Sequence, residues 1–261
     1  MVFLIAIIVS ALALGTIIVL HERYGFLAVD RFPNATSKVV AYAWLGVLFF
    51  VMSGLVIASS RSPVRTIEPD QVSFWSLFLL HVILVIFLAG WWTLSGRPPI
   101  RSFLNWQPAD GSRAAAVGLA VGVGGWALTI GAALTIALIL SAFDLIPKDL
   151  KPSPMIPWMA TLPMWKKGVI VLMAMTVEEA FFRGFLQKRI GLVASTILFA
   201  LAHAGYGQPF MLIGVTIISI VIGATFYWTK DLRPCIVAHG VFDAIQLFVI
   251  VPLVLKLMPA S

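Results

Sequence analysis

Residues 175–184 place three charged side chains, Glu178, Glu179 and Arg183, inside a run that otherwise has the composition of a membrane-spanning helix. A charge near the centre of a bilayer costs about 2.5 to 3.5 kcal/mol even on lenient insertion scales, so three together need partners and a purpose. Glu179 and Arg183 are four residues apart and share a helix face, which predicts an ion pair. Glu178 lies about 100° further round the helix and is left without a partner there. Loss of hydration makes such a carboxylate a better proton acceptor, so Glu178 is the first candidate for a general base.

Further ionisable residues fall inside apolar segments later in the chain. His203 ends the motif Phe199-x-x-x-His203, while His239 and Asp243 are again four residues apart and share a helix face. Only three of the eleven Asp and Glu residues lie within apolar segments, and all three are in the last third of the chain. These groups could simply hydrogen-bond helices together. A cluster spread over three helices favours a functional site instead, because ionisable residues inside a membrane are expensive.

One more histidine, His81, lies in an apolar segment of the first half of the chain. A lone histidine in such a helix is expected to be satisfied by a neighbouring backbone carbonyl or side chain. The sequence therefore predicts a structural role for His81.

The carboxylates and imidazoles of the cluster raise the question of a metal, since such groups can hold zinc or a di-iron centre. The spacing argues against it, because the chain has neither His-Glu-x-x-His nor Glu-x-x-His. Without a metal, the same parts make a hydrolase, with a carboxylate base, one histidine that holds water, and a second histidine with its Asp neighbour on the oxyanion side. A nucleophilic Ser195 or Thr196 is a weaker candidate, because no Gly-x-Ser-x-Gly motif surrounds them. We therefore predict a metal-independent site without a cofactor.

The composition predicts the fold class. With 61% hydrophobic and 11% charged residues and a mean hydropathy of +1.02, the chain lies outside the range of soluble domains. The net charge of +7 comes from Lys and Arg scattered among short loops, so we expect a lipid bilayer and no nucleic acid as partner. The single cysteine, Cys235, excludes an internal disulfide. We predict an all-α, polytopic integral membrane bundle of about eight transmembrane helices, in a bacterial or archaeal cell membrane.

The elements that must position the cluster can be placed along the chain. We expect one membrane domain over residues 1–261, with amino-terminal spans and an access loop in 1–165 and the core helices that carry the motifs in 166–250. Within the first part, Gly118 and Gly122 predict a face on which another helix packs closely. The predicted spans are residues 1–20, 39–59, 74–94, 114–143, 168–187, 191–204, 210–228 and a last one from about 232, with a proline-rich loop over 144–167.

Two further expectations concern the arrangement in the membrane. At 1.5 Å per residue, Glu178, His203 and His239 would lie about 15, 21 and 9 Å from the helix ends on one side, so straight helices would not bring them together. We therefore predict that the sixth or eighth helix is tilted, shifted or broken. Lys and Arg are slightly more numerous in the odd-numbered loops, which predicts that both termini lie outside.

The motifs Glu178-Glu179-x-x-x-Arg183, Phe199-x-x-x-His203 and His239-x-x-x-Asp243, in this order, resemble those of the CPBP family of intramembrane glutamic endopeptidases. This family is also known as the Abi group, and it includes type II CAAX prenyl proteases and bacteriocin-processing proteins. The resemblance covers residues 165–250 and implies that Glu178 is the base and that His203 positions the water. It implies a supporting role for Glu179 and Arg183.

The same resemblance implies that His239 and Asp243 hold the oxyanion side. The prenyl-protease branch usually has Asn at the last position, where this chain has Asp. An ionised Asp cannot donate a hydrogen bond, so Asp243 is either protonated or orients His239.

The implied activity is a metal-independent intramembrane protease that cuts a membrane-anchored or transmembrane protein or peptide. Prenylated CAAX proteins, bacteriocin-type peptides and sorting tails all stay open as substrates. Two other functions remain as alternatives: a proton-coupled transporter and a non-catalytic peptide-binding or immunity protein. Against a transporter, the chain has no pair of Gly- or Pro-broken helices in two symmetric halves.

Overall fold

The structure is a computed structural model that describes residues 2–25, 30–61, 73–108, 110–145, 155–204 and 209–257. All regular structure in these residues is helical, which confirms the predicted all-α class. Much of the predicted access loop, residues 146–154, lies outside the described residues, as does the stretch 205–207 that was expected to end the sixth span.

The described residues form a series of helical elements. In chain order they are α1 (Val2–Tyr24), α2 (Ala35–Arg61), the 3-10 helix η2 (Phe74–Phe78), α3 (Leu79–Leu94), α4 (Ile100–Leu104), α5 (Gly111–Ala142), α6 (Met155–Thr161), α7 (Met164–Met173), η3 (Ala174–Glu178), η4 (Ala180–Gln187), α8 (Lys188–Ala202), α9 (Pro209–Thr229), α10 (Leu232–Ala244), η6 (Ile245–Ile250) and α11 (Val251–Leu257). The elements η3, η4 and η6 are π-helical, so their backbone bonds run from residue i to i+5.

The protein is a multi-pass integral membrane protein. Among the described residues, six stretches are long and apolar enough to cross a bilayer: Leu4–His21, Ala35–Gly54, Phe74–Leu94, Gly111–Ala142, Met211–Thr229 and Leu232–Leu257. The other two of the eight predicted segments are the charged path through α7, η3 and η4, and α8 with its 15 residues. Large apolar side chains such as Leu12, Val39 and Leu138 are exposed on the outer faces, as expected of surfaces that contact lipid. The orientation across the membrane stays a prediction.

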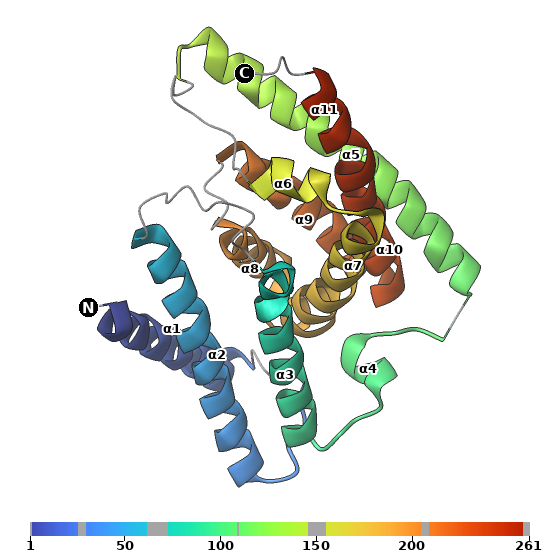
Figure 1. Ribbon diagram of the computed structural model, residues 1–261. Helices are drawn as coiled ribbons and strands as arrows, with labels where there is room; N and C mark the ends of the chain where they lie inside the picture. The colour runs from blue at the N-terminus through green and yellow to red at the C-terminus, as the bar shows by residue number, and fades with distance from the viewer. Residues whose placement is uncertain are drawn as a thin grey trace.

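The path α7–η3–η4 runs through the middle of the bundle. Figure 1 shows α1, α2 and α3 on one side of it and α5 on the other. The middle path contacts α3, α8, α9 and α10. Side chains from these four helices can therefore reach a site on it.

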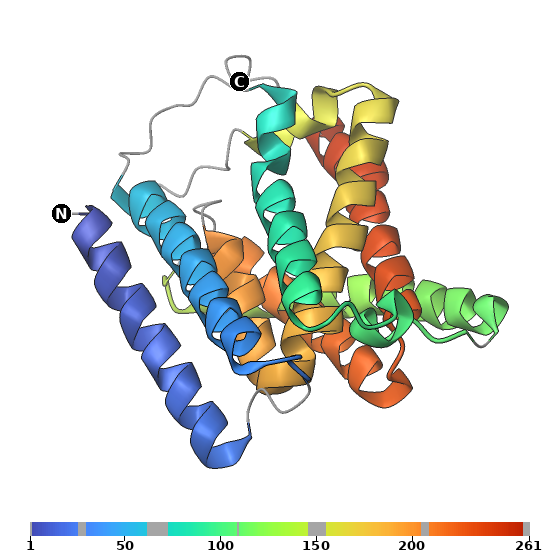
Figure 2. The ribbon, with the colours of Figure 1, turned by 90° about the horizontal axis from the view of Figure 1, so that it is seen from below.

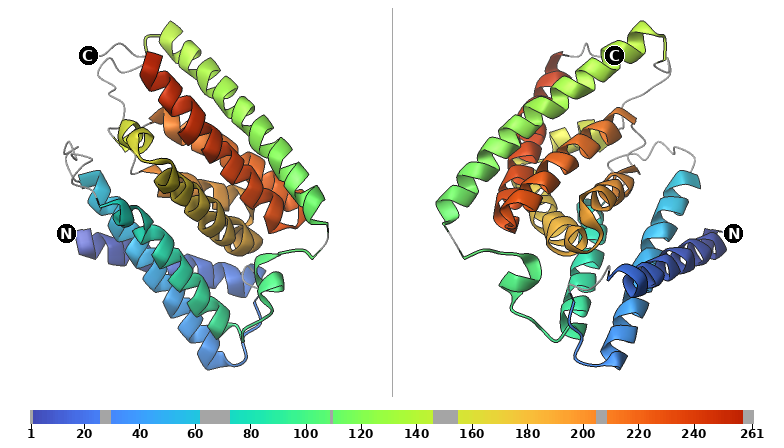
Figure 3. Two further views of the ribbon diagram at one scale, coloured as in Figure 1. Left: turned by 45° about the vertical axis from the view of Figure 1, so that its right-hand side comes forward. Right: turned by 180° about the vertical axis from the view of Figure 1, so that it is seen from behind.

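The helices α5 and α10 pack closely through glycines. A Cβ added at Gly118 would lie 2.8 Å from the carbonyl oxygen of Pro234, and one at Gly122 would lie 2.8 Å from that of Ala238. No side chain fits at such separations, so the predicted close-packing face is confirmed. Figure 3 (left) shows α5 running alongside α10 and α11.

The chain breaks its helical path at Gly191. This residue has φ 79° and ψ 173°, a backbone conformation that glycine adopts far more readily than other residues. Gly191 is the first residue of the predicted sixth span, so the break separates the fifth and sixth predicted spans and lets the rest of α8 leave the line of η4. That the sixth or eighth helix is itself tilted, shifted or broken stays a prediction.

The amino-terminal helices are joined to the middle path by an aromatic core and a buried ion pair. The ring of Phe185 on η4 lies 5.3 Å from that of Phe87 and 5.2 Å from that of Trp91, both on α3. Asp30 accepts two hydrogen bonds from the buried guanidinium of Arg189, which also stacks 3.8 Å above the ring of Phe185. These contacts fix the position of α3 against the helix that carries the glutamates.

Candidate active site

Glu179 lies at the centre of a closed set of charges. Its Oε1 is 3.0 Å from Arg183 Nη1 and 2.8 Å from His239 Nδ1, and its side chain is 0% exposed. The predicted ion pair with Arg183 is therefore confirmed. Arg183 also donates from Nη2 to Ser219 Oγ at 3.1 Å and packs 4.5 Å from the ring of Phe199. These contacts hold the fully buried Glu179 by charge from two sides.

Glu178 has a different environment, although it is the next residue towards the amino terminus. Its Oε1 lies 3.2 Å from His81 Nε2, and its Oε2 lies 3.9 Å from His203 Nε2. Glu178 was expected to lack a partner on its own helix, and the groups that face its two oxygens are imidazoles from α3 and α8. The 3.9 Å separation is too long for a direct hydrogen bond, and the side chain is 12% exposed.

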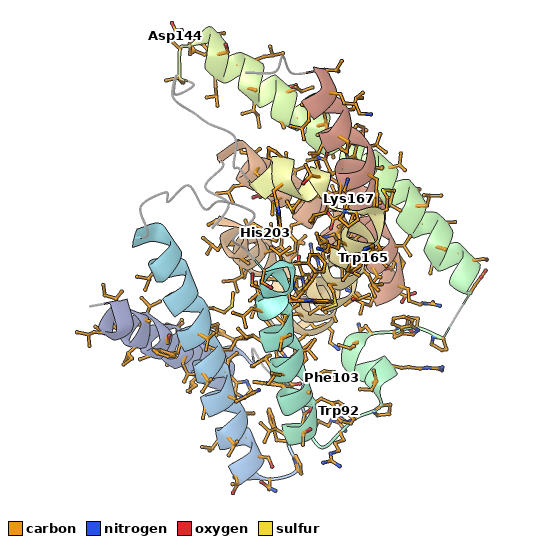
Figure 4. All side chains as sticks on the ribbon, in the orientation of Figure 1. Trp92, Phe103, Asp144, Trp165, Lys167 and His203 are labelled. Carbon is orange, nitrogen blue, oxygen red and sulfur yellow. The ribbon has the colours of Figure 1, made fainter. Side chains whose placement is uncertain are left out.

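His203 caps the end of α8, where Figure 4 marks it. Its Nδ1 lies 2.8 Å from the carbonyl oxygen of Phe199, to which it can only donate. A neutral ring with the proton on Nδ1 leaves the lone pair of Nε2 facing Glu178. Two acceptors 3.9 Å apart are well placed to share one water molecule that donates to both.

His239 is held between two carboxylates. Its Nδ1 contacts Glu179 Oε1, and its Nε2 lies 3.3 Å from Asp243 Oδ2, one helical turn away on α10. For both contacts to be hydrogen bonds to ionised carboxylates, both ring nitrogens must carry hydrogen. Of the two roles left open for Asp243, this geometry supports the orientation of His239.

The three residues that were expected to converge, Glu178, His203 and His239, do so only in part. Glu178 and His203 come together, as predicted, across the break at Gly191. His239 instead reaches Glu179, so the site consists of two neighbouring sets of residues, one around each glutamate. The ring of Phe199 lies between these sets, 4.6 Å from that of His203 and 6.1 Å from that of His239.

Sequence reasoning missed His81. We expected a structural histidine, but the structure places it on the predicted base, so that three of the chain's four histidines gather at the two glutamates. The one available signal was that His81 interrupts an apolar segment, and that signal does not name its partner.

The candidate nucleophile Ser195 has a structural contact instead of a place beside the glutamates. Ser195 Oγ is buried and donates to the carbonyl oxygen of Phe182 at 2.8 Å, as a side chain that ties two helices together would. In the part of the chain that the structure describes, no group of three or more His, Cys, Asp or Glu side chains has the geometry to hold a metal ion.

The segment that carries both glutamates matches a known protein family. Residues 160–245 match the family model described as "Type II CAAX prenyl endopeptidase Rce1-like". This segment is an Rce1-like domain. The match confirms the resemblance inferred from the three motifs, and the domain contains Glu178, Glu179, His203 and His239.

A protein of Bacillus subtilis (strain 168), "Uncharacterized protein YpbD", is 38% identical to the chain over 77 residues. These residues make up 29% of this chain and 41% of the relative, so the chain spans less than half of that protein's length. No solved structure matches the chain. The Rce1-like domain begins at residue 160, after α1, α2 and α3, so His81 comes to the site from outside it.

Proposed function

We propose that the protein is an intramembrane endopeptidase in which Glu178 activates a water molecule. The Rce1-like domain implies an intramembrane protease. The observation that carries the finer assignment is the pair of acceptors, Glu178 Oε2 and His203 Nε2, held 3.9 Å apart by separate helices. A water between them would donate one hydrogen to each and keep an oxygen lone pair for attack.

The chemical step needs no group from outside the site. The water oxygen forms a bond to the scissile carbonyl carbon while Glu178 takes one of its protons, which gives a tetrahedral intermediate with a negative oxygen. Glu178 then returns the proton to the leaving nitrogen as the carbon–nitrogen bond breaks. The products are a carboxylic acid and an amine, and Glu178 is again ionised.

The oxyanion is assigned to His239. Its Nε2 contact with Asp243, at 3.3 Å, is longer than its Nδ1 contact with Glu179, at 2.8 Å. The side chain of Asp243 is also 26% exposed and has room to move. The Nε2–H is therefore the donor that can turn to a developing negative oxygen, while Glu179 keeps the ring in place.

The substrate class follows from where the site lies. The two glutamates and Arg183 lie within the helical bundle, so a peptide bond must enter from the membrane or its surface to be cut. We propose a membrane-anchored or transmembrane protein or peptide as substrate.

Cleavage by the purified full chain tests the proposal. The chain in liposomes is given three internally quenched peptides: a farnesylated CAAX peptide, the same peptide without the lipid, and a single-span peptide with a polar tail. We expect the wild type to cut at least one of them, and Glu178→Gln to be slower by about 10² to 10⁴-fold with an unchanged melting temperature, since the amide keeps the shape but cannot accept the proton. A folded wild type that cuts none of the three, or an equally active Glu178→Gln, would overturn it.

A further inference from the structure

The face of α3 that packs into the molecule is apolar except at one position. Its buried side chains are Leu84, Phe87 and Trp91, spaced at three or four residues, and Phe78 of η2 continues the same face. His81 occupies the position between Phe78 and Leu84. Packing alone would favour an aliphatic residue there.

Structural hydrogen bonds do not compensate for the burial of His81. Among the described residues its buried Nδ1 has no hydrogen-bond partner, and its side chain is only 13% exposed. Within the described part of the chain, the ring bonds no backbone carbonyl, which is one of the two kinds of partner expected of a structural histidine. Its polar contact is with Glu178 Oε1, 3.2 Å from Nε2, and the two groups need a small rotation to come into line for a hydrogen bond.

The rest of α3 is held firmly against the helix that carries Glu178. Trp44 on α2 donates from Nε1 to the carbonyl oxygen of Phe87 at 3.1 Å, and the rings of Phe87 and Phe181 lie 5.9 Å apart. Figure 2 shows α3 beside the middle path, and α3 contacts η3, where Glu178 lies. The imidazole of His81 therefore projects from a helix that is packed firmly in place.

We propose that His81 is a positioning residue of the site, whose Nε2–H holds Glu178 Oε1 so that Oε2 faces His203. A carboxylate held at one oxygen has one remaining oxygen with a fixed direction, which is what the capture of a single water requires. Without His81, the carboxylate can rotate and the water loses one of its two acceptors. This inference rests on the proposed function and adds to the site a residue from outside the Rce1-like domain.

Replacement of the ring tests the proposal. We expect His81→Leu to lower kcat by about 10²-fold, since a misplacement of about 1 Å at a reacting group has an effect of that size. KM should stay within about twofold, because His81 acts on the water and not on substrate binding. The melting temperature should be unchanged or raised, because leucine fits the apolar face. His81→Gln, whose amide can donate from nearly the same place as Nε2, should recover most of kcat.

Matched measurements separate the outcomes. His21→Leu removes a histidine from α1, outside the site, and should leave kcat unchanged. The peptide used is whichever of the three quenched peptides the wild type cuts fastest. If Glu178→Gln is inactive while His81→Leu keeps the wild-type kcat, the role of His81 is wrong and the proposed function stands. If both His81 variants lose activity only in proportion to a lowered melting temperature, His81 is structural and the proposal falls. If Glu178→Gln is fully active, the proposed function itself is wrong.

Discussion

Glu178 and Glu179 are adjacent in sequence and opposite in environment. Glu179 has an arginine and a histidine within 3.0 Å and no exposed surface. Glu178 has two imidazoles at 3.2 and 3.9 Å and a small exposed fraction. A buried carboxylate held by two charged partners is fixed in place, whereas a more loosely held one can bind water and accept a proton. We therefore expect the charge partners of Glu179 to stabilise the structure, and the looser contacts of Glu178 to leave room for a water molecule.

The two environments arise from the helix on which the residues lie. The π-helical elements η3 and η4 flank Glu179, and wide helical turns of this kind are frequent at functional sites. Glu178 contacts residues of α3 and α8 while Glu179 contacts His239 of α10, because successive residues project in different directions around the helix.

The largest expected effect is the loss of turnover without the loss of binding in Glu178→Gln. The amide keeps the size of the side chain and one oxygen that can accept from His81, so the protein should retain its substrate uncut. Pull-down of the tagged variant from its native membrane, followed by mass spectrometry, should recover an uncut protein that the wild type releases as fragments. Recovery of the same fragments from both proteins would show that Glu178 is not the base.

A large effect of another kind is expected for Glu179→Gln. It leaves Arg183 buried without its charge partner, which typically costs about 3 to 5 kcal/mol of folding stability. The variant should melt well below the wild type in detergent. Combination with Arg183→Met removes the orphaned charge and should restore part of the melting temperature. If Glu179→Gln instead abolished proteolysis with an unchanged melting temperature, the roles of the two glutamates would be reversed.

A smaller effect is expected for Asp243→Asn. The amide oxygen can still accept from His239 Nε2, but the negative charge beside the ring is lost. We expect kcat to fall by less than about tenfold, since a partly exposed ion pair contributes only about 0 to 1 kcal/mol. Kinetics of Asp243→Asn and Asp243→Leu should differ, with the leucine variant slower. Equal rates for both would remove Asp243 from the orientation of His239.

No effect is expected from chelators. Because the carboxylates and imidazoles of the site are engaged with one another and lack the spacing of a zinc site, EDTA or 1,10-phenanthroline should leave the rate unchanged. Inhibition by chelator that added Zn²⁺ reverses would favour a metalloprotease.

Local patterns in the sequence were enough to predict several features. The apolar segments, the Glu179–Arg183 pair, the shared face of His239 and Asp243, and the close packing at Gly118 and Gly122 all follow from helix periodicity within one or two segments. The end of the fifth predicted span and the start of the sixth lie on either side of the break at Gly191, as the basic residues Lys188 and Arg189 between them suggested.

Contacts between distant segments could not be predicted. Nothing in the sequence indicates that His81 faces Glu178 across 97 positions, or that His239 meets Glu179 and not Glu178. These contacts depend on how α3 and α10 are rotated about their own axes, and that rotation is set by side-chain packing such as the Phe87–Phe185 contact. The π-helical turns likewise have no simple sequence signal.

Because Arg189 pairs with Asp30, the Rce1-like domain depends on a residue outside its own boundaries, and we do not expect it to fold well on its own. Arg189 lies inside the Rce1-like domain, but its carboxylate partner comes from the connection between α1 and α2. A fragment beginning at residue 160 would keep the guanidinium, stacked on Phe185, and lose the only acidic group that neutralises it among the described residues. Protein engineers who want the catalytic segment alone would therefore have to redesign position 189 or supply the first helices as a separate, complementing chain.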